Sequence, residues 1–122
     1  MPHKDKYYSI ENGQILVHVF KGEIDYNNIV ESYQYIHENQ LLKPEHKGII
    51  SHCLDAKFNL SKEHKQLFIN CIETNIPRHI KMAPLIDSTD IIYPMMHAAV
   101  IPNHMLKPFS TIEGAIDWII NQ

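Results

Sequence analysis

Three nearly continuous apolar stretches, each of strand length, constrain the fold most. The stretches are residues 14–21, 48–54 and 80–86. The side chains that alternate between the two faces of the first stretch are Ile15, Leu16, Val17, His18, Val19 and Phe20. Strands that need cover on both sides are typical of parallel sheets with helices packed against them. We therefore expect these stretches to be central strands of an α/β domain.

Helical spacing of apolar residues separates these strands. Asp25 can cap a first helix through its carboxylate, and that helix is expected to end near Asn39, before Pro44. Its predicted inner face comprises Tyr26, Ile29, Val30, Tyr33, Ile36 and His37. A second helix is predicted to begin at Ser61 and to end before Pro77. Its predicted inner face comprises Leu67, Phe68, Cys71 and Ile72.

The two ends of the chain complete the pattern. Residues 7–11 predict a first strand, with Asn12 and Gly13 as a two-residue hairpin turn into the next strand. Beyond residue 86 we expect a short helix that begins at Asp90 or later, and then a strand over 105–109. Ser110 and Glu113 fit a capping box. The closing helix should bury Ile112, Ala115, Ile116, Trp118 and Ile119.

The predicted order is β-β-α-β-α-β-α-β-α within a single domain over residues 1–122. A hairpin followed by alternating strands and helices favours a mainly parallel sheet with right-handed crossovers and an antiparallel strand at one edge. The fold class is therefore α/β.

The composition argues against two classes of partner. The net charge is −3 and the basic residues are scattered, which argues against nucleic-acid binding. The sequence contains no apolar run of the roughly 18 residues that a membrane span needs. The first six residues are polar and lack the apolar core of a signal peptide. We therefore expect a cytoplasmic protein with no membrane span.

Nine histidines and two cysteines raise the question of a metal site. His52 and Cys53 are adjacent, and neighbours on a strand point to opposite faces unless a bulge intervenes. No Cys-x-x-Cys or His-x-x-x-His spacing occurs. We expect no metal, no cofactor and no catalytic residue, with Cys53 and Cys71 as free core thiols. His18, on a covered strand, is expected to be a hydrogen-bonded core residue.

The layout resembles the SpoIIAA-like, or STAS, superfamily of small α/β domains. The segments that carry the resemblance are residues 14–25, 47–50 with Asp55, 60–63, 108–110 and 113–119. The resemblance implies the fold of that superfamily and a role in regulation or protein interaction. Its anti-sigma-factor antagonists are phosphorylated on a serine at the start of the helix after the third strand, and Ser61 is the nearest equivalent here. Residues 56–60 separate Asp55 from Ser61, so the chain looks more like the branch of the superfamily without an assigned activity.

Polar residues follow two of the predicted central strands. Because parallel strands end at one edge of a sheet, and ligands of α/β domains bind at that edge, these residues are candidates for a binding site. The candidate set is Asp55, Asn59, Ser61, Asp87, Ser88 and Thr89. The same residue types also serve as caps and turn formers without any further role.

Two classes of function follow. The first is a non-enzymatic module that binds a protein partner or a small anionic ligand at the strand-end edge. The alternative is a carrier of a small molecule or lipid, or an enzyme, with a pocket between the third helix and the sheet. Tyr93, His97 and His104 would supply the polar groups of that pocket. We also expect a homodimer, because two of the strands are apolar on both faces and only four helices are predicted to cover them.

Overall fold

A five-stranded sheet forms the centre of the molecule, with the strand order β1-β2-β3-β4-β5. The structure is a computed structural model, and it describes residues 6–59, 64–87 and 104–122. The strands are β1 (Tyr7–Ile10), β2 (Ile15–Ile24), β3 (Gly48–Phe58), β4 (Lys81–Leu85) and β5 (Met105–Leu106). β1 pairs with β2 in the antiparallel direction, and the other three pairs are parallel. The predicted mainly parallel sheet with an antiparallel edge strand is confirmed.

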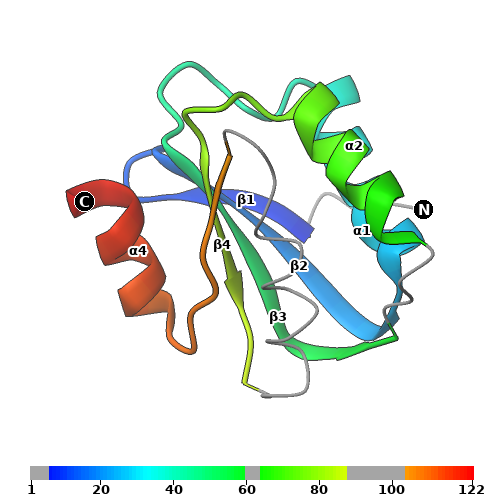
Figure 1. Ribbon diagram of the computed structural model, residues 1–122. Helices are drawn as coiled ribbons and strands as arrows, with labels where there is room; N and C mark the ends of the chain where they lie inside the picture. The colour runs from blue at the N-terminus through cyan, green and yellow to red at the C-terminus, as the bar shows by residue number, and fades with distance from the viewer. Residues whose placement is uncertain (1–5, 60–63, 88–103) are drawn as a thin grey trace.

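Helices cover both faces of this sheet (Figure 1). The described helices are α1 (Tyr26–Glu38), α2 (Lys65–Asn75) and α4 (Ile112–Asn121). The larger core cluster joins α1 and α2 to one face of the sheet, and a smaller cluster joins α4 to the other face. The predicted short helix after Asp90 lies outside the described residues. Within the described ranges, no helix is long and apolar enough to cross a membrane.

The hairpin between β1 and β2 is longer than predicted. Ile10 pairs with Ile15, so residues 11–14 form a four-residue loop rather than the expected two-residue turn. Glu11, Asn12 and Gly13 all have positive φ angles. The loop is closed by a hydrogen bond from Gly13 N–H to the Ile10 carbonyl at 3.1 Å. Asn-Gly therefore marked the turn correctly but did not fix its length.

β3 ends at Phe58, four residues beyond its predicted end at Leu54. A bulge in this part of the strand changes which side chains face the core. Val19 pairs with His52, and Lys21 pairs with Asp55, so β3 holds one more residue than β2 between these two pairs. Strict alternation after Cys53 would place Asp55 and Lys57 against the helices. The extra residue instead turns Ala56 and Phe58 toward the larger core cluster. Asp55 and Lys57 are exposed as a result.

The predicted helix starts can be compared with the structure at α1 and α4. Asp25 caps α1 as predicted, since its carboxylate accepts a hydrogen bond from Asn28 N–H at 2.9 Å. The described helix α2 is Lys65–Asn75 with His64 before it, and the predicted helix start at Ser61 lies outside the described residues. Thr111, not Ser110, caps α4, because the hydroxyl of Thr111 accepts from Gly114 N–H at 3.1 Å.

The helix faces match the prediction at most positions. α1 buries Tyr26, Ile29, Val30, Tyr33 and Ile36, and α2 buries Phe68, Cys71 and Ile72. The predicted inner faces also include His37 and Leu67, but both side chains are exposed. Each lies beside a buried position, so helical spacing alone does not resolve the boundary of the buried stripe. The last predicted strand is also shorter, because after Leu106 only an isolated bridge from Phe109 to Leu85 continues it.

α4 lies against the start of β3 and is also held by a lysine. Lys81 on β4 donates from Nζ to the carbonyl of Trp118 at 3.0 Å and to that of Gln122 at 2.7 Å. A cation that bonds the last carbonyls of a helix also complements the helix dipole. At Gly48, a Cβ atom would lie 2.7 Å from Ile119 Cγ2. The close packing of α4 therefore requires a glycine at this position.

We expect Gly48→Ala to lower the free energy of unfolding by about 1–3 kcal/mol, because the added methyl group would displace α4 from the sheet. Urea denaturation measures this change. The matched test is the same substitution in an Ile119→Ala background, where the space for the methyl group exists. There Gly48→Ala should cost much less. Equal costs in the two backgrounds would show that the contact with Ile119 does not limit residue 48.

Candidate functional site

The strand-end edge carries three of the six predicted binding residues in the described ranges. His52 pairs with Leu85, so the later residues of β3 and β4 extend toward the same edge of the sheet. Asp55, Asn59 and Asp87 are all exposed there. Asp55 lies within β3, whereas the sequence predicts it at the end of that strand. Ser61, Ser88 and Thr89 lie outside the described residues, so the predicted phosphorylation site does too.

The pocket of the alternative prediction falls mostly outside the described residues, since Tyr93, His97 and the third helix do. His104 is described, and its Nε2–H donates to the carbonyl of Ile76 at 2.8 Å. Ile76 is the C-cap residue of α2. This contact gives His104 a structural role at the end of a helix.

A chain of hydrogen-bonded side chains crosses the core. His18 on β2 has no solvent exposure, and its Nδ1 lies 2.8 Å from the hydroxyl oxygen of Ser32 on α1. Its Nε2 forms a hydrogen bond with the hydroxyl of Ser51 on β3. The hydroxyl of Tyr7 lies 3.0 Å from that of Ser32, and the hydroxyl of Tyr33 lies 3.2 Å from that of Ser51. The chain therefore runs Tyr7–Ser32–His18–Ser51–Tyr33 and joins four elements.

The direction of the chain follows from a count of protons. Each hydroxyl carries one proton and a neutral imidazole carries one, so five groups share four hydrogen bonds and one end proton remains. Tyr33 is 3% exposed, whereas Tyr7 is only half-buried. An unbonded donor costs more in the interior. We infer that Tyr33 donates to Ser51, Ser51 to His18, His18 Nδ1–H to Ser32, and Ser32 to Tyr7. The remaining proton lies at Tyr7.

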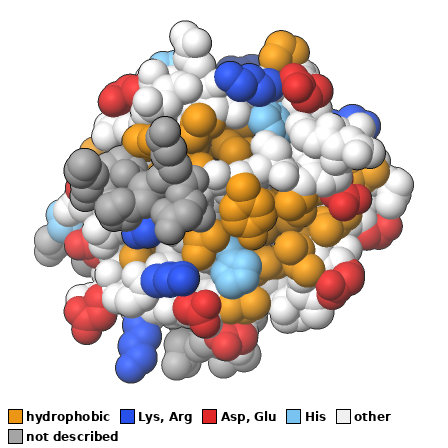
Figure 2. All heavy atoms as spheres, turned by 180° about the vertical axis from the view of Figure 1, so that it is seen from behind, with side chains coloured by type: hydrophobic (Ala, Val, Ile, Leu, Met, Phe, Trp, Pro, Cys, Tyr) orange, Lys and Arg blue, Asp and Glu red, His pale blue; other side chains and the backbone are white. Residues whose placement is uncertain are grey.

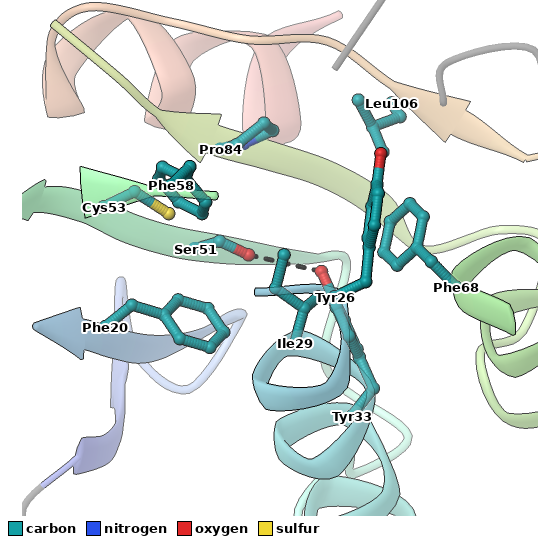
Figure 3. A pocket seen from close by; sticks show the side chains of 10 residues that line it. All are labelled: Phe20, Tyr26, Ile29, Tyr33, Ser51, Cys53, Phe58, Phe68, Pro84 and Leu106. Carbon is teal, nitrogen blue, oxygen red and sulfur yellow. Dashed lines mark hydrogen bonds between the residues drawn. The ribbon is translucent and has the colours of Figure 1, made fainter. Parts of the chain in front are cut away.

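The Tyr33 end of the chain meets a small apolar cavity (Figure 3). Its lining comes from α1, α2 and four strands and comprises Phe20, Tyr26, Ile29, Tyr33, Ser51, Cys53, Phe58, Phe68, Pro84 and Leu106. Figure 3 shows the Tyr33 and Ser51 hydroxyls bonded to each other among these carbon side chains. The cavity volume is about 20 Å³, which is room for one water molecule. In this form it is too small for a metabolite.

Sequence reasoning identified His18 as a hydrogen-bonded core residue, which is confirmed, but it missed the rest of the chain. A signal was present: Ser51 alternates with Ile49 and Cys53 on a buried strand face. A polar residue in such a row needs a partner inside the core. The sequence does not identify the hydrogen-bond partner of Ser51, because that partner depends on the pairing of β2 with β3 and on the packing of α1 against them.

Burial fixes the protonation states of the core groups. Burial lowers the pKa of His18 to about 3, so the ring is neutral at pH 7. His46, also buried, accepts a hydrogen bond from Lys43 N–H on Nδ1 at 2.7 Å. Its Nε2–H then donates to Ser9 at 3.0 Å. Burial lowers the pKa of His46 as well. Neither ring can gain a proton without loss of a hydrogen bond.

Both thiols are buried. Both cysteines are free, and burial raises the pKa of Cys53 to about 12. Because the thiolate is the nucleophile, this shift works against covalent catalysis at Cys53. His52, its neighbour, is only partly buried, yet its Nδ1 atom is shielded and has no partner among the described residues. Over the same residues, no three His, Cys, Asp or Glu side chains converge on a metal position.

Comparison with solved structures identifies the fold. An uncharacterized protein of the DUF3478 family with a SpoIIAA-like fold, from Shewanella loihica PV-4, superposes with a TM-score of 0.62. The match covers 93% of this chain and 89% of that chain at 14% identity. The unphosphorylated form of the anti-sigma factor antagonist SpoIIAA superposes with a TM-score of 0.57, over 95% of this chain and 97% of that chain, at 16% identity.

The fold is SpoIIAA-like. The resemblance predicted from the sequence is thus confirmed at the level of the fold. No family model matches the chain, and no curated protein matches it in sequence. At such low identity the SpoIIAA-like fold does not itself assign a function, so residue roles have to come from the geometry of this chain.

We expect the free energy of unfolding to decrease as the pH falls from about 7 toward 4. The folded pKa of His18 is below its ordinary value, so the unfolded chain binds a proton in this range while the folded protein does not. One such group contributes a slope of up to about 1.4 kcal/mol per pH unit. His46 acts in the same direction.

Urea denaturation at several pH values measures the slope, and NMR titration of the His18 ring assigns it. The ring should keep its neutral shifts from pH 8 to about pH 5 in the folded state. A stability that does not change between pH 7 and pH 5, or a His18 ring that titrates near its ordinary pKa, would contradict the account.

Proposed function

We propose that this protein is a non-enzymatic interaction module that binds a protein partner at the strand-end edge of the sheet. The observation that carries the proposal is the bulge in β3, which turns Asp55 and Lys57 outward on strands that run past the end of β4. Without it, the alternation would direct both charges into the core. Asp55 and Lys57 would thus present their charges to a partner from a backbone that is held in place by pairing with β2.

Two further points support this proposal. One protein of the same fold is an anti-sigma factor antagonist, which suggests by analogy that this fold can serve protein interaction. The buried His18 and Cys53 have pKa shifts that keep the ring neutral and the thiol protonated, so neither is prepared for acid–base or nucleophilic work. The proposed surface comprises Asp55, Lys57, Asn59 and Asp87, together with the nearby predicted residues Ser61, Ser88 and Thr89.

The test is affinity capture from the native host with the wild-type chain and with Asp55→Lys, followed by quantitative mass spectrometry. We expect one or a few proteins whose recovery falls at least about tenfold with Asp55→Lys, since a like charge placed against a complementary partner costs several kcal/mol. Glu45→Lys, which makes the same charge change in the exposed loop before β3, is the matched control and should keep the partner. Equal recovery from all three proteins would move the recognition surface elsewhere.

We also propose that the chain forms a homodimer through the sheet face on the α4 side. α4 is the one described helix on this face, and several apolar side chains around it remain partly exposed. They are Ile10, Val19, Leu54, Phe109, Ile112, Ile116, Trp118 and Ile120. Figure 2, drawn from behind the view of Figure 1, shows apolar side chains gathered into one area rather than scattered. Apolar areas of this kind on a protein surface mark contact sites.

We expect light scattering at micromolar concentration to give twice the mass of one chain. Leu54→Lys, at the edge of this face, should shift the mass to that of one chain, because a lysine would have to be desolvated in the contact. Leu67→Lys is the matched control, since Leu67 is exposed on α2, on the opposite side of the sheet. A wild-type protein with the mass of one chain would contradict the dimer.

A further inference from the structure

A groove of about 210 Å³ lies between the first half of α1 and the outer edge of β2. β1 pairs with β2 only up to His18, so β2 residues 19–24 pair on one side alone among the described strands. The groove lies along this part of β2. Its lining comprises Lys6, Tyr7, Val19, Phe20, Lys21, Ile24, Asn28, Glu31 and Ser32.

The groove combines apolar and cationic lining. Phe20 and Ile24 supply carbon surface, and Lys6 and Lys21 supply two positive charges. Glu31 is the only acidic residue in the lining, so the formal charge is +2 − 1 = +1. No ion pair that would cancel these charges is formed between Glu31 and either lysine in the described structure.

Two neutral donors complete the lining. Asn28 uses its Oδ1 to accept from Asp25 N–H at 2.8 Å, which leaves its NH₂ group as a donor. Tyr7 is the end of the buried chain where the unshared proton remains in the direction inferred above, because Ser32 then donates to it. The His18 chain therefore presents the groove with a hydroxyl that acts as a donor. The side chains of Lys6, Tyr7, Lys21 and Asn28 can then all donate hydrogen bonds to a ligand. Glu31 is an acceptor, and the Ser32 hydroxyl proton is already used.

We propose that this groove binds a small carboxylate with an apolar body, such as a short-chain fatty acid. The lysines, Tyr7 and Asn28 would hold the carboxylate, since ionised acceptors form the stronger hydrogen bonds. Phe20 and Ile24 would contact the hydrocarbon part. The volume is below the roughly 300–1,000 Å³ of pockets for drug-sized ligands, so the ligand is small. Lys21 pairs with Asp55 in the sheet, so the groove adjoins the proposed partner surface, but carboxylate binding in the groove does not require a protein partner.

The experiment is a ¹⁵N-HSQC titration of the full chain with hexanoate, and with hexanamide as the neutral analogue of the same length. Hexanoate should shift the amide signals of the groove residues with a Kd on the order of 1 mM. Hexanamide should bind at least about fivefold more weakly, because it lacks the charge that the lysines recognise.

Variants distinguish binding in the groove from nonspecific attraction of hexanoate to positive charge. Lys21→Gln and Tyr7→Phe should each weaken hexanoate about fivefold. Lys47→Gln removes the same charge as Lys21→Gln from an exposed position at the opposite end of the sheet, and should leave binding unchanged. The proposal is overturned if hexanoate shifts no groove signal at concentrations on the order of 10 mM. It is also overturned if hexanamide binds equally well, or if Lys47→Gln weakens binding as much as Lys21→Gln.

Discussion

The hydrogen-bonded chain through His18 is the interaction on which the rest of the structure depends. It joins β1, β2, α1 and β3, and its central ring is fully buried. Both ring nitrogens have a hydroxyl partner, so the desolvation of His18 is compensated only while α1 and β3 keep their positions relative to β2. Loss of one partner leaves a buried polar group unpaired, at a cost of about 1–3 kcal/mol. Apolar packing brings these elements together, and this chain fixes their relative positions.

The sequence predicted the parts of the fold that depend on local pattern. Two-faced apolar strands and the inner residues of α1 were visible in the order of side chains, as was the cap at Asp25. The bulge in β3 was not, because no residue type marks it, and without it the strand seemed to end at Leu54. The cap of α4 is Thr111, one residue after the predicted Ser110, and both residues have capping chemistry. Such errors arise where a tertiary contact decides between two locally acceptable choices.

The candidate sites follow the same division. Parallel connectivity predicted that Asp55, Asn59 and Asp87 extend toward one edge, and each is exposed there. The sequence could not predict that the bulge is what exposes Asp55 and Lys57. Nor could it predict the groove beside β2, which depends on β1 ending its pairing at His18. The two sites adjoin at the Lys21–Asp55 pair of the sheet, and the buried chain contributes only to the groove.

We infer that the hydrogen-bonded chain donates in one direction, from Tyr33 toward Tyr7, which places the proton of His18 on Nδ1. Long-range ¹H–¹⁵N correlation spectra of the folded protein distinguish the two imidazole tautomers, because the protonated and bare nitrogens differ widely in chemical shift. At pH 7 we expect a neutral His18 ring with Nδ1 protonated and Nε2 bare. A ring protonated on Nε2, or one that carries both protons, would contradict this inference.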